Sequence, residues 1–261
     1  MISLASLPRD EAARLRGLLF DLDDTFLSHG VLTREAYGAL WDLHDAGLRL
    51  VAVTGRPSGW GEVVVRQWPI DAAVTENGAI VVVREGRGVG LRDSCSAEER
   101  RRRRARLAAL IDEARAAVPR AQLADDVAAR TSDATWDVGE RQALPEPDVA
   151  RLMELIVAGG ARTLRSSVHV HASFDATDKA QGVLRFLGEA FGEDAGAARG
   201  RYAFVGDSAN DAACFAAFRT TVGVANVRGY VGKMSVPPRY IAAGAMGAGF
   251  AELARVMLAA R

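Results

Sequence analysis

The sequence has few cysteines and no excess of charge of either sign. Its 261 residues include two cysteines, Cys95 and Cys214, which excludes a disulfide framework and is typical of proteins in a reducing compartment. Lysine plus arginine number 33, as do aspartate plus glutamate, so no net field favours nucleic acid or an anionic membrane surface. We therefore expect a cytoplasmic protein whose partners are neither nucleic acids nor membranes.

Long apolar runs are also missing. None approaches the roughly 18 residues that a membrane-spanning helix needs. The first 17 residues mix acidic with basic side chains and lack a continuous apolar segment, so they do not form a signal-peptide pattern. With 49% hydrophobic residues, the chain is long enough for one large globular domain or two smaller ones.

Strand and helix patterns alternate at both ends of the chain. Apolar runs at 17–21 and 48–54 each end in a polar or glycine-rich turn, with the amphipathic segment 33–47 between them, which predicts a strand, a helix and a strand. The alternation predicts a parallel sheet flanked by helices. Its further predicted elements are a helix at 58–68, a helix at 179–191, a strand at 201–207, a helix at 210–218, a strand at 220–225 and a helix at 249–258.

The middle of the chain has a different pattern. It holds a long arginine-rich helix at 97–117, a second helix near 145–160 and extended segments such as 166–174. We interpret it as an inserted α+β domain. The predicted division is a catalytic core of residues 1–83 and 177–261 and an inserted domain of residues 84–176.

Two carboxylates follow the first predicted strand. Residues i and i+2 of an extended chain project to the same side, so Asp21 and Asp23 can face one ligand. Ligands of open parallel sheets bind beyond the carboxyl ends of the strands, where this pair lies. When the pair is taken alone, an acidic turn with no further role is the better explanation.

Two further strand ends carry polar groups. Thr54 offers a hydroxyl and Gly55 a backbone N–H, both suited to a phosphate oxygen. A third strand ends before Asp207 and Asp211, with Asn210 beside them as a neutral hydrogen-bonding group. Common turn chemistry or a capped helix start accounts for each segment taken alone.

Taken together, these strand ends predict a metal. Carboxylates gathered in one crevice repel one another unless a divalent cation lies among them, and oxygen ligands favour Mg²⁺. The expected metal-site residues are Asp21, Asp23, Asp207 and Asp211. Lys179 opens the helix after the inserted domain and can place a positive charge against a phosphate, although a solvated lysine is the alternative.

The four segments, in this order, resemble the motifs of the haloacid dehalogenase superfamily. The resemblance rests on Asp21-x-Asp23-x-Thr25, Thr54, Lys179 and Gly206-Asp207-x-x-Asn210-Asp211. The gap between Asp21 and Thr54 is too short for an inserted cap, so the cap lies between Thr54 and Lys179. This arrangement, with Glu76-Asn77-Gly78-Ala79, is similar to the type IIB, Cof-like branch, and implies a Rossmann-like α/β core with a C2-type cap.

The resemblance implies a magnesium-dependent phosphatase that forms an aspartyl-phosphate. Asp21 would attack phosphorus, and Asp23 would protonate the leaving alcohol and then activate water. Thr54, Gly55, Lys179 and Asn210 would bind the phosphoryl group or orient its partners. Mg²⁺ would be held by Asp21, the Asp23 carbonyl and Asp207, next to Asp211. The implied substrate is a small phosphorylated metabolite, with a sugar phosphate as the best candidate.

Some residues are weaker candidates for substrate binding. Arg56 and Asn77 lie in the predicted turns, and His169 and His171 alternate on a predicted strand of the inserted domain, so both histidines face the site or both face solvent. The block at residues 100–104 is arginine-rich, and flanking acidic residues indicate a solvated helix face. A monomer or small homo-oligomer is compatible with the sequence.

Three alternatives remain open at this stage. A phosphomutase of the phosphomannomutase type would return the phosphoryl group to another hydroxyl. A phospho-acceptor signalling domain also uses an aspartate, a threonine and a lysine in this order, but needs neither Asp23 nor a cap. A dehalogenase needs neither the metal cluster nor a second aspartate.

Overall fold

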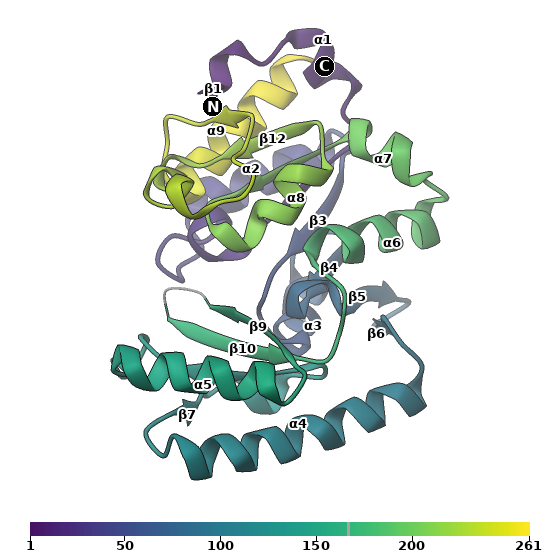
Figure 1. The fold of residues 1–261 in the computed structure, drawn as a ribbon. Helices are drawn as coiled ribbons and strands as arrows, with labels where there is room; N and C mark the ends of the chain where they lie inside the picture. The colour runs from purple at the N-terminus through teal and green to yellow at the C-terminus, as the bar shows by residue number, and fades with distance from the viewer. Residues whose placement is uncertain (166–167) are drawn as a thin grey trace.

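The computed structural model describes residues 1–165 and 168–261, which form a large α/β core and a smaller α+β unit beside it (Figure 1). The core has a nine-stranded sheet, in which neighbouring strands are parallel from β1 to β4 and antiparallel from β4 to β6. In spatial order these strands are β1 (Ile2–Ser3), β13 (Tyr240–Ile241), β12 (Thr220–Gly223), β11 (Tyr202–Gly206), β2 (Gly17–Phe20), β3 (Arg49–Val53), β4 (Ala72–Thr75), β5 (Ile80–Glu85) and β6 (Gly88–Asp93).

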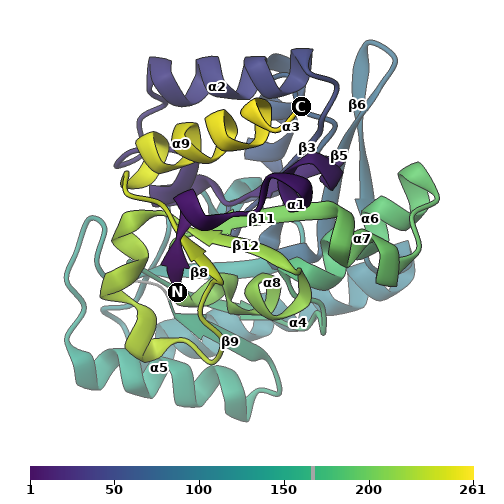
Figure 2. The ribbon, with the colours of Figure 1, turned by 90° about the horizontal axis from the view of Figure 1, so that it is seen from above.

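Helices cover both faces of the core sheet, which confirms the predicted parallel-sheet architecture (Figure 2). One face carries α1 (Arg9–Arg14), α2 (Arg34–Asp45), α3 (Ser58–Gln67) and α9 (Met246–Ala259), and the other carries α6 (Lys179–Phe191), α7 (Ala195–Arg201) and α8 (Ala212–Ala217). No helix in the described part of the chain is both long enough and apolar enough to cross a bilayer.

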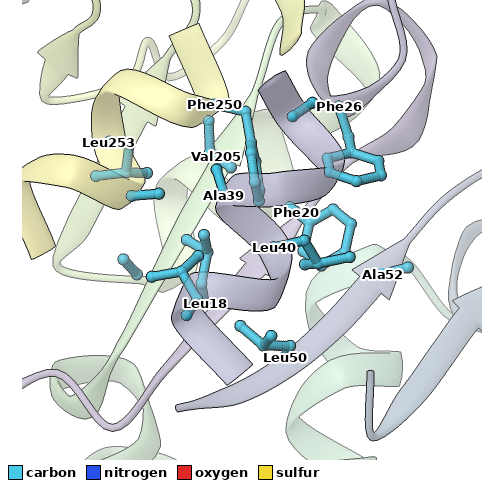
Figure 3. Close-up of a cluster of buried hydrophobic side chains, with 14 of the residues drawn as sticks. Leu18, Phe20, Phe26, Ala39, Leu40, Leu50, Ala52, Val205, Phe250 and Leu253 are labelled. Atoms are coloured by element: carbon cyan, nitrogen blue, oxygen red, sulfur yellow. The ribbon is translucent and has the colours of Figure 1, made fainter. Parts of the chain in front are cut away.

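Aromatic rings fill the layer between the sheet and helices α2 and α9 (Figure 3). Phe26 lies in the turn after β2. Its ring is 5.1 Å from the ring of Phe20, in a tilted contact, and 4.8 Å from the ring of Phe250, in an edge-on contact. These three rings are fully buried. They hold the turn at residues 21–27 against α9, so the carboxylates of that turn have a rigid base.

The smaller unit packs two helices on one face of a four-stranded sheet and turns the other face toward the core (Figure 1). Trp136 and Val170 point to the helices, and alternate residues of the same strands point the other way. Its elements are α4 (Ala97–Ala117), β7 (Gln122–Leu123), β8 (Asp133–Asp137), α5 (Glu146–Ala158), β9 (Arg162–Arg165) and β10 (His169–Ser173). Of the predicted segment 166–174, residues 166–167 lie outside the described residues.

The predicted start of the inserted domain at residue 84 needs a correction. Residue 84 lies within β5, and β6 also pairs in the core sheet. The hairpin was missed because β6 is an edge strand without a buried face, so it lacks the alternation that marks a strand. We propose 94–176 for the inserted segment, called the cap below.

Residues 1–16, which precede the first motif, complete the edge of the sheet. β1 pairs in parallel with β13, and Leu4 and Leu15 are buried against the core. Glu11 accepts hydrogen bonds from Thr220 Oγ1 at 2.7 Å and from Arg239 Nη1 at 2.9 Å. These residues therefore cover an edge that would otherwise present unpaired backbone groups.

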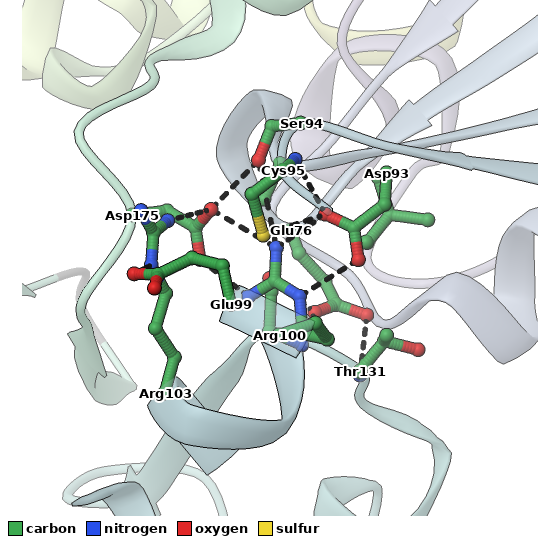
Figure 4. A network of polar contacts seen from close by, with 12 residues as sticks. Glu76, Asp93, Ser94, Cys95, Glu99, Arg100, Arg103, Thr131 and Asp175 are labelled. Atoms are coloured by element: carbon green, nitrogen blue, oxygen red, sulfur yellow. Dashed lines mark hydrogen bonds and ion pairs between the residues drawn. The ribbon is translucent and has the colours of Figure 1, made fainter. Parts of the chain in front are cut away.

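Arg100 ties together the two segments that join core and cap (Figure 4). Its guanidinium donates to Asp93, at the end of β6, at 2.6 and 2.8 Å, and to Asp175, after β10, at 2.6 and 3.0 Å. Arg103 adds a bond of 2.8 Å to Asp175. The expected solvated helix face is wrong for Arg100, which is 6% exposed; its partners lie too far away in sequence for periodicity to reveal them.

Replacing Arg100 should destabilise the protein strongly. Arg100→Met leaves the buried Asp175 with one cation fewer, and breaking a buried ion pair costs about 3–5 kcal/mol. Arg101→Met, one residue along on the exposed face, is the matched control. We expect the thermal midpoint of Arg100→Met to fall by roughly 10 °C and that of the control to stay within about 2 °C. Equal midpoints for both variants would contradict the assignment.

Candidate active site

Asp21 lies directly after β2, at the carboxyl edge of the parallel sheet, and contacts Lys179. Lys179 Nζ donates to Asp21 Oδ1 at 2.7 Å, although 158 residues separate the two in the chain. Both side chains are almost completely buried. Burial raises the pKa of Asp21 well above its usual range, against the opposing effect of Lys179. An aspartate oxygen is thus fixed in a dry position beside a cation.

Lys179 is placed by the start of α6. Asp178 caps this helix by accepting from the Gln181 N–H at 2.8 Å, so Lys179 is its first residue. Burial alone would lower the pKa of Lys179, but the carboxylates of Asp21 and Asp211 raise it on balance, so the lysine is charged. The predicted helix start therefore delivers a permanent positive charge to the end of β2.

Asp207 and Asp211 follow β11, the neighbour of β2 in the sheet. Asp211 Oδ1 accepts from Lys179 Nζ at 2.7 Å, and its Oδ2 accepts from the backbone N–H groups of Asp207 and Ser208 at 2.9 and 3.2 Å. Asp211 therefore holds its own loop as well as the lysine. Burial, followed by the charge of Asp211, raises the pKa of Asp207 to about 7.

The buried carboxylates fit a divalent cation. Oxygen atoms of Asp21, Asp207 and Asp211 lie within 4.8 Å of one another, and Lys179 brings one positive charge against three negative ones. Burial, together with the neighbouring carboxylates, raises the pKa values of Asp21 and Asp207. A hard cation with oxygen ligands, such as Mg²⁺, would balance the charge.

Asp23 points to a different partner. Its carboxylate accepts from Arg56 Nε at 2.9 and 3.0 Å and from Nη2 at 2.5 Å, and the Arg56 guanidinium stacks 4.1 Å over the ring of Trp60. The side chain of Asp23 is 48% exposed, whereas Asp21 is buried. In the structure Arg56 thus pairs with Asp23. The contact of Arg56 with substrate stays a prediction.

The turns after β3 and β4 pack against each other beside Asp21. The Asn77 N–H donates to the Thr54 carbonyl at 3.2 Å, and a Cβ on Gly55 would lie 3.1 Å from Asn77 Oδ1. Thr54 Oγ1 accepts from the Arg56 N–H at 3.0 Å. Gly55 therefore allows the close approach that packs Asn77 onto the predicted phosphate-binding turn.

Asn226 completes the arrangement around Asp207 and was not predicted. Its Nδ2 donates to Asp207 Oδ2 at 3.0 Å and to the Asp24 carbonyl at 2.9 Å. Thr25 Oγ1 contacts Asp207 Oδ1 at 3.4 Å. A signal for Asn226 was present, because it follows β12, which ends at the same sheet edge. Predicted Asn210 lies nearby and accepts from Lys179 Nζ at 3.3 Å.

The cap turns a polar sheet face toward these turns. His171 and Leu164 on the cap, with Glu76 and Asn77 on the core, line a pocket between the two units. His171 Nδ1 lies 3.1 Å from both Asp133 Oδ2 and Thr135 Oγ1. The ring of His169 lies 6.0 Å from that of His171. The two histidines therefore lie on the same face of the cap sheet, as both expected arrangements require.

Comparison with known proteins found a family model that matches part of the chain. Residues 18–98 match the family model of the haloacid dehalogenase-like hydrolases. No curated protein sequence matches this chain. The matched segment is less than half of the chain, and the whole chain shares its fold with solved phosphatases.

Solved structures share this fold over most of their length. The sucrose-phosphatase from Synechocystis sp. PCC6803 has a TM-score of 0.67 and 18% identity, covering 93% of this chain and 98% of the other. The C-terminal domain of trehalose-6-phosphate phosphatase from C. albicans has a TM-score of 0.72 and 11% identity, covering 99% and 97%. The subclass IIB sugar phosphatase BT4131 has a TM-score of 0.57 and 16% identity, covering 87% and 93%.

Proposed function

We propose that this protein is a Mg²⁺-dependent phosphatase of small phosphorylated metabolites that works through an aspartyl-phosphate on Asp21. One observation carries the proposal: a buried aspartate at the end of β2 contacts a buried lysine, with two more carboxylates beside it, below the polar face of a cap. The family match to haloacid dehalogenase-like hydrolases supports it.

Two half-reactions divide the work between Asp21 and Asp23. An Asp21 carboxylate oxygen forms a bond to phosphorus as the bond from phosphorus to the leaving oxygen breaks, and Asp23 gives its proton to that oxygen. Asp23 then takes a proton from water, whose oxygen attacks phosphorus and releases Asp21 and inorganic phosphate. Since Arg56 donates hydrogen bonds to the Asp23 carboxylate, the acid step requires Asp23 to leave Arg56 for the leaving oxygen.

The remaining polar residues hold the phosphoryl group in this scheme. Lys179 supplies a fixed charge against its oxygens, and Thr54 and the Gly55 N–H supply hydrogen-bond donors. Asp21, Asp207 and Asp211, with the Asp23 carbonyl, would hold Mg²⁺, which when bound neutralises phosphate charge. Asn226 and Thr25 keep Asp207 oriented.

A sugar phosphate is the proposed substrate class. The cavity between cap and core carries hydrogen-bonding side chains, including His171 and Asn77, which suit a leaving group rich in hydroxyls. Two of the structural neighbours are named for sucrose-phosphate and trehalose 6-phosphate. The low cysteine count supports the further proposal that the protein acts in the cytoplasm.

Phosphate release from a panel of sugar phosphates, with Mg²⁺ or with a chelator, tests the proposal. We expect release that requires Mg²⁺. Conversion of a hexose 1-phosphate to the 6-phosphate without release of phosphate would replace the hydrolase with a mutase. A stable aspartyl-phosphate without turnover would instead favour a phospho-acceptor domain, and turnover that survives the chelator would remove the metal from the proposal.

Asp23→Asn should separate the two half-reactions. General acid and base catalysis contributes about 10²- to 10⁴-fold, so we expect a loss of this size with an alkyl phosphate. With p-nitrophenyl phosphate, whose leaving group needs no proton, stopped-flow absorbance should show a burst of one equivalent of nitrophenolate followed by slow turnover. Loss of the burst together with the steady state would show that Asp23 does not act as the acid.

A further inference from the structure

Glu76 is a buried carboxylate that the proposed chemistry does not use. It is 4% exposed, and among the described residues its hydrogen-bond donors are three backbone N–H groups and one hydroxyl, with no cation. Such a group is costly to bury and is stable only while all its donors are in place. An ionised carboxylate, which only accepts, matches this set of donors.

The four donors come from both sides of the joint between core and cap. The Ser58 N–H of the core and the Thr131 N–H of the cap each donate to Oε1 at 2.9 Å. The Ser132 N–H and Oγ of the cap donate to Oε2 at 2.5 and 2.6 Å. Figure 4 shows Glu76 reaching Thr131 beside the Arg100 network. One side chain of the core therefore fixes the start of cap strand β8.

The backbone around Glu76 is held in an unfavourable conformation. Glu76, Asn77 and Gly78 have successive positive φ angles of 49°, 54° and 103°, and the first two are not glycine. Left-handed backbone at ordinary residues costs free energy and persists only where the surroundings enforce it. The turn thereby directs Glu76 to the cap and Asn77 to Gly55, on the phosphate-binding turn.

The cap segment that Glu76 holds also touches the phosphate-binding turn. Arg130 Nη1 donates to the Gly55 carbonyl at 3.1 Å and to both oxygens of Asp133 at 3.0 Å. Asp133 in turn contacts His171. A continuous set of hydrogen bonds thus runs from the turn that would bind phosphate to the cap face that would bind the leaving group.

We propose that Glu76 is a positioning residue that sets the cap's substrate face at a fixed distance from the phosphate site. This inference rests on the proposed phosphatase function. Substrates whose leaving group contacts the cap depend on Glu76, and substrates held by their phosphate alone do not. Glu76 selects for hydroxyl-rich leaving groups by holding the cap in place.

Glu76→Gln tests the proposal, because it keeps the shape but points an amide N–H₂ at groups that are all donors. The substrates are glucose 6-phosphate, with a hydroxyl-rich leaving group, and p-nitrophenyl phosphate, without hydroxyls. We expect kcat/KM for glucose 6-phosphate to fall at least about 30-fold, mainly through KM, and that for p-nitrophenyl phosphate to fall less than about 3-fold. Ser132→Ala, which removes one donor, should shift the ratio in the same direction by less.

Glu193→Gln is the matched control, since Glu193 is equally buried and binds Arg49 and Arg201 away from the site. It should leave the ratio of the two kcat/KM values unchanged. Equal losses for both substrates in Glu76→Gln, or no loss for either, would overturn the proposal.

Hydrogen exchange separates this inference from the proposed function. Without substrate, the amides of Thr131 and Ser132 should exchange at least about tenfold faster in Glu76→Gln than in the wild type or in Glu193→Gln. Unchanged exchange would show that Glu76 does not hold the cap, even if the enzyme is a phosphatase. Faster exchange in a protein that releases no phosphate would support the role of Glu76 and reject the proposed function.

Discussion

We expect Asp21→Asn to abolish turnover and to leave the fold intact. The amide oxygen can still accept from Lys179 Nζ, so the 2.7 Å contact has a substitute, but the amide is not a nucleophile. Removing a covalent nucleophile costs roughly four orders of magnitude in kcat or more. The measurement is phosphate release by the purified variant with the best substrate of the panel, together with its thermal midpoint.

Asp24→Asn is the matched control for this substitution. Asp24 is in the same turn, and its side chain accepts from the exposed His29 N–H. Its φ of 53° is one that asparagine adopts readily, so the turn should be undisturbed. We expect near wild-type kcat for Asp24→Asn. Residual turnover above about 1% in Asp21→Asn, with contamination excluded, would assign the nucleophile to another residue.

We expect Lys179→Met to lose both stability and activity. Lys179 is 1% exposed and is the cation in contact with Asp21 and Asp211, so its removal leaves buried carboxylates uncompensated. The expected loss of stability is about 3–5 kcal/mol, which lowers the thermal midpoint by about 2–4 °C per kcal/mol. Activity should fall by at least about 10²- to 10³-fold, as when a donor to a developing oxyanion is removed.

The sequence offers one natural control for Lys179. The chain has two lysines, and the other, Lys233, is exposed. Lys233→Met should change neither the midpoint nor the activity. Adding Mg²⁺ should recover part of the lost stability in Lys179→Met, because a cation then shares the site with the carboxylates. If Lys179→Met melts like the wild type, the buried ion pairs do not carry the charge balance described above.

Much of the core could be predicted from local patterns. Helices α4 and α6 begin and end where the sequence placed them, and Ser96 and Asp178 cap their first turns. The strand ends with Asp21 and Asp207 were also found, since each apolar run stops abruptly at a polar residue. The catalytic roles assigned to these residues stay predictions until variants are measured.

Long-range contacts could not be predicted in this way. In the sequence Arg100 is one arginine among five, yet it is buried because Asp93, the last residue of β6, and Asp175, which follows β10, meet at its guanidinium. Glu76 was noted only as part of a motif, and its donors at Ser58 and Thr131 lie 18 and 55 residues away. Periodicity describes neighbours within one element and gives no partner across two domains.

The close packing of Gly78 on the start of α6 has a consequence for how this architecture can change. A Cβ at Gly78 would lie 2.0 Å from the Asp178 carbonyl, so two backbones meet directly beside Lys179. This brace belongs entirely to the core, although the chain enters α6 straight from the cap. We expect Lys179 to keep its position when the inserted segment is exchanged. The core can therefore accept a different cap, in evolution or by design, without losing the arrangement of its charged residues.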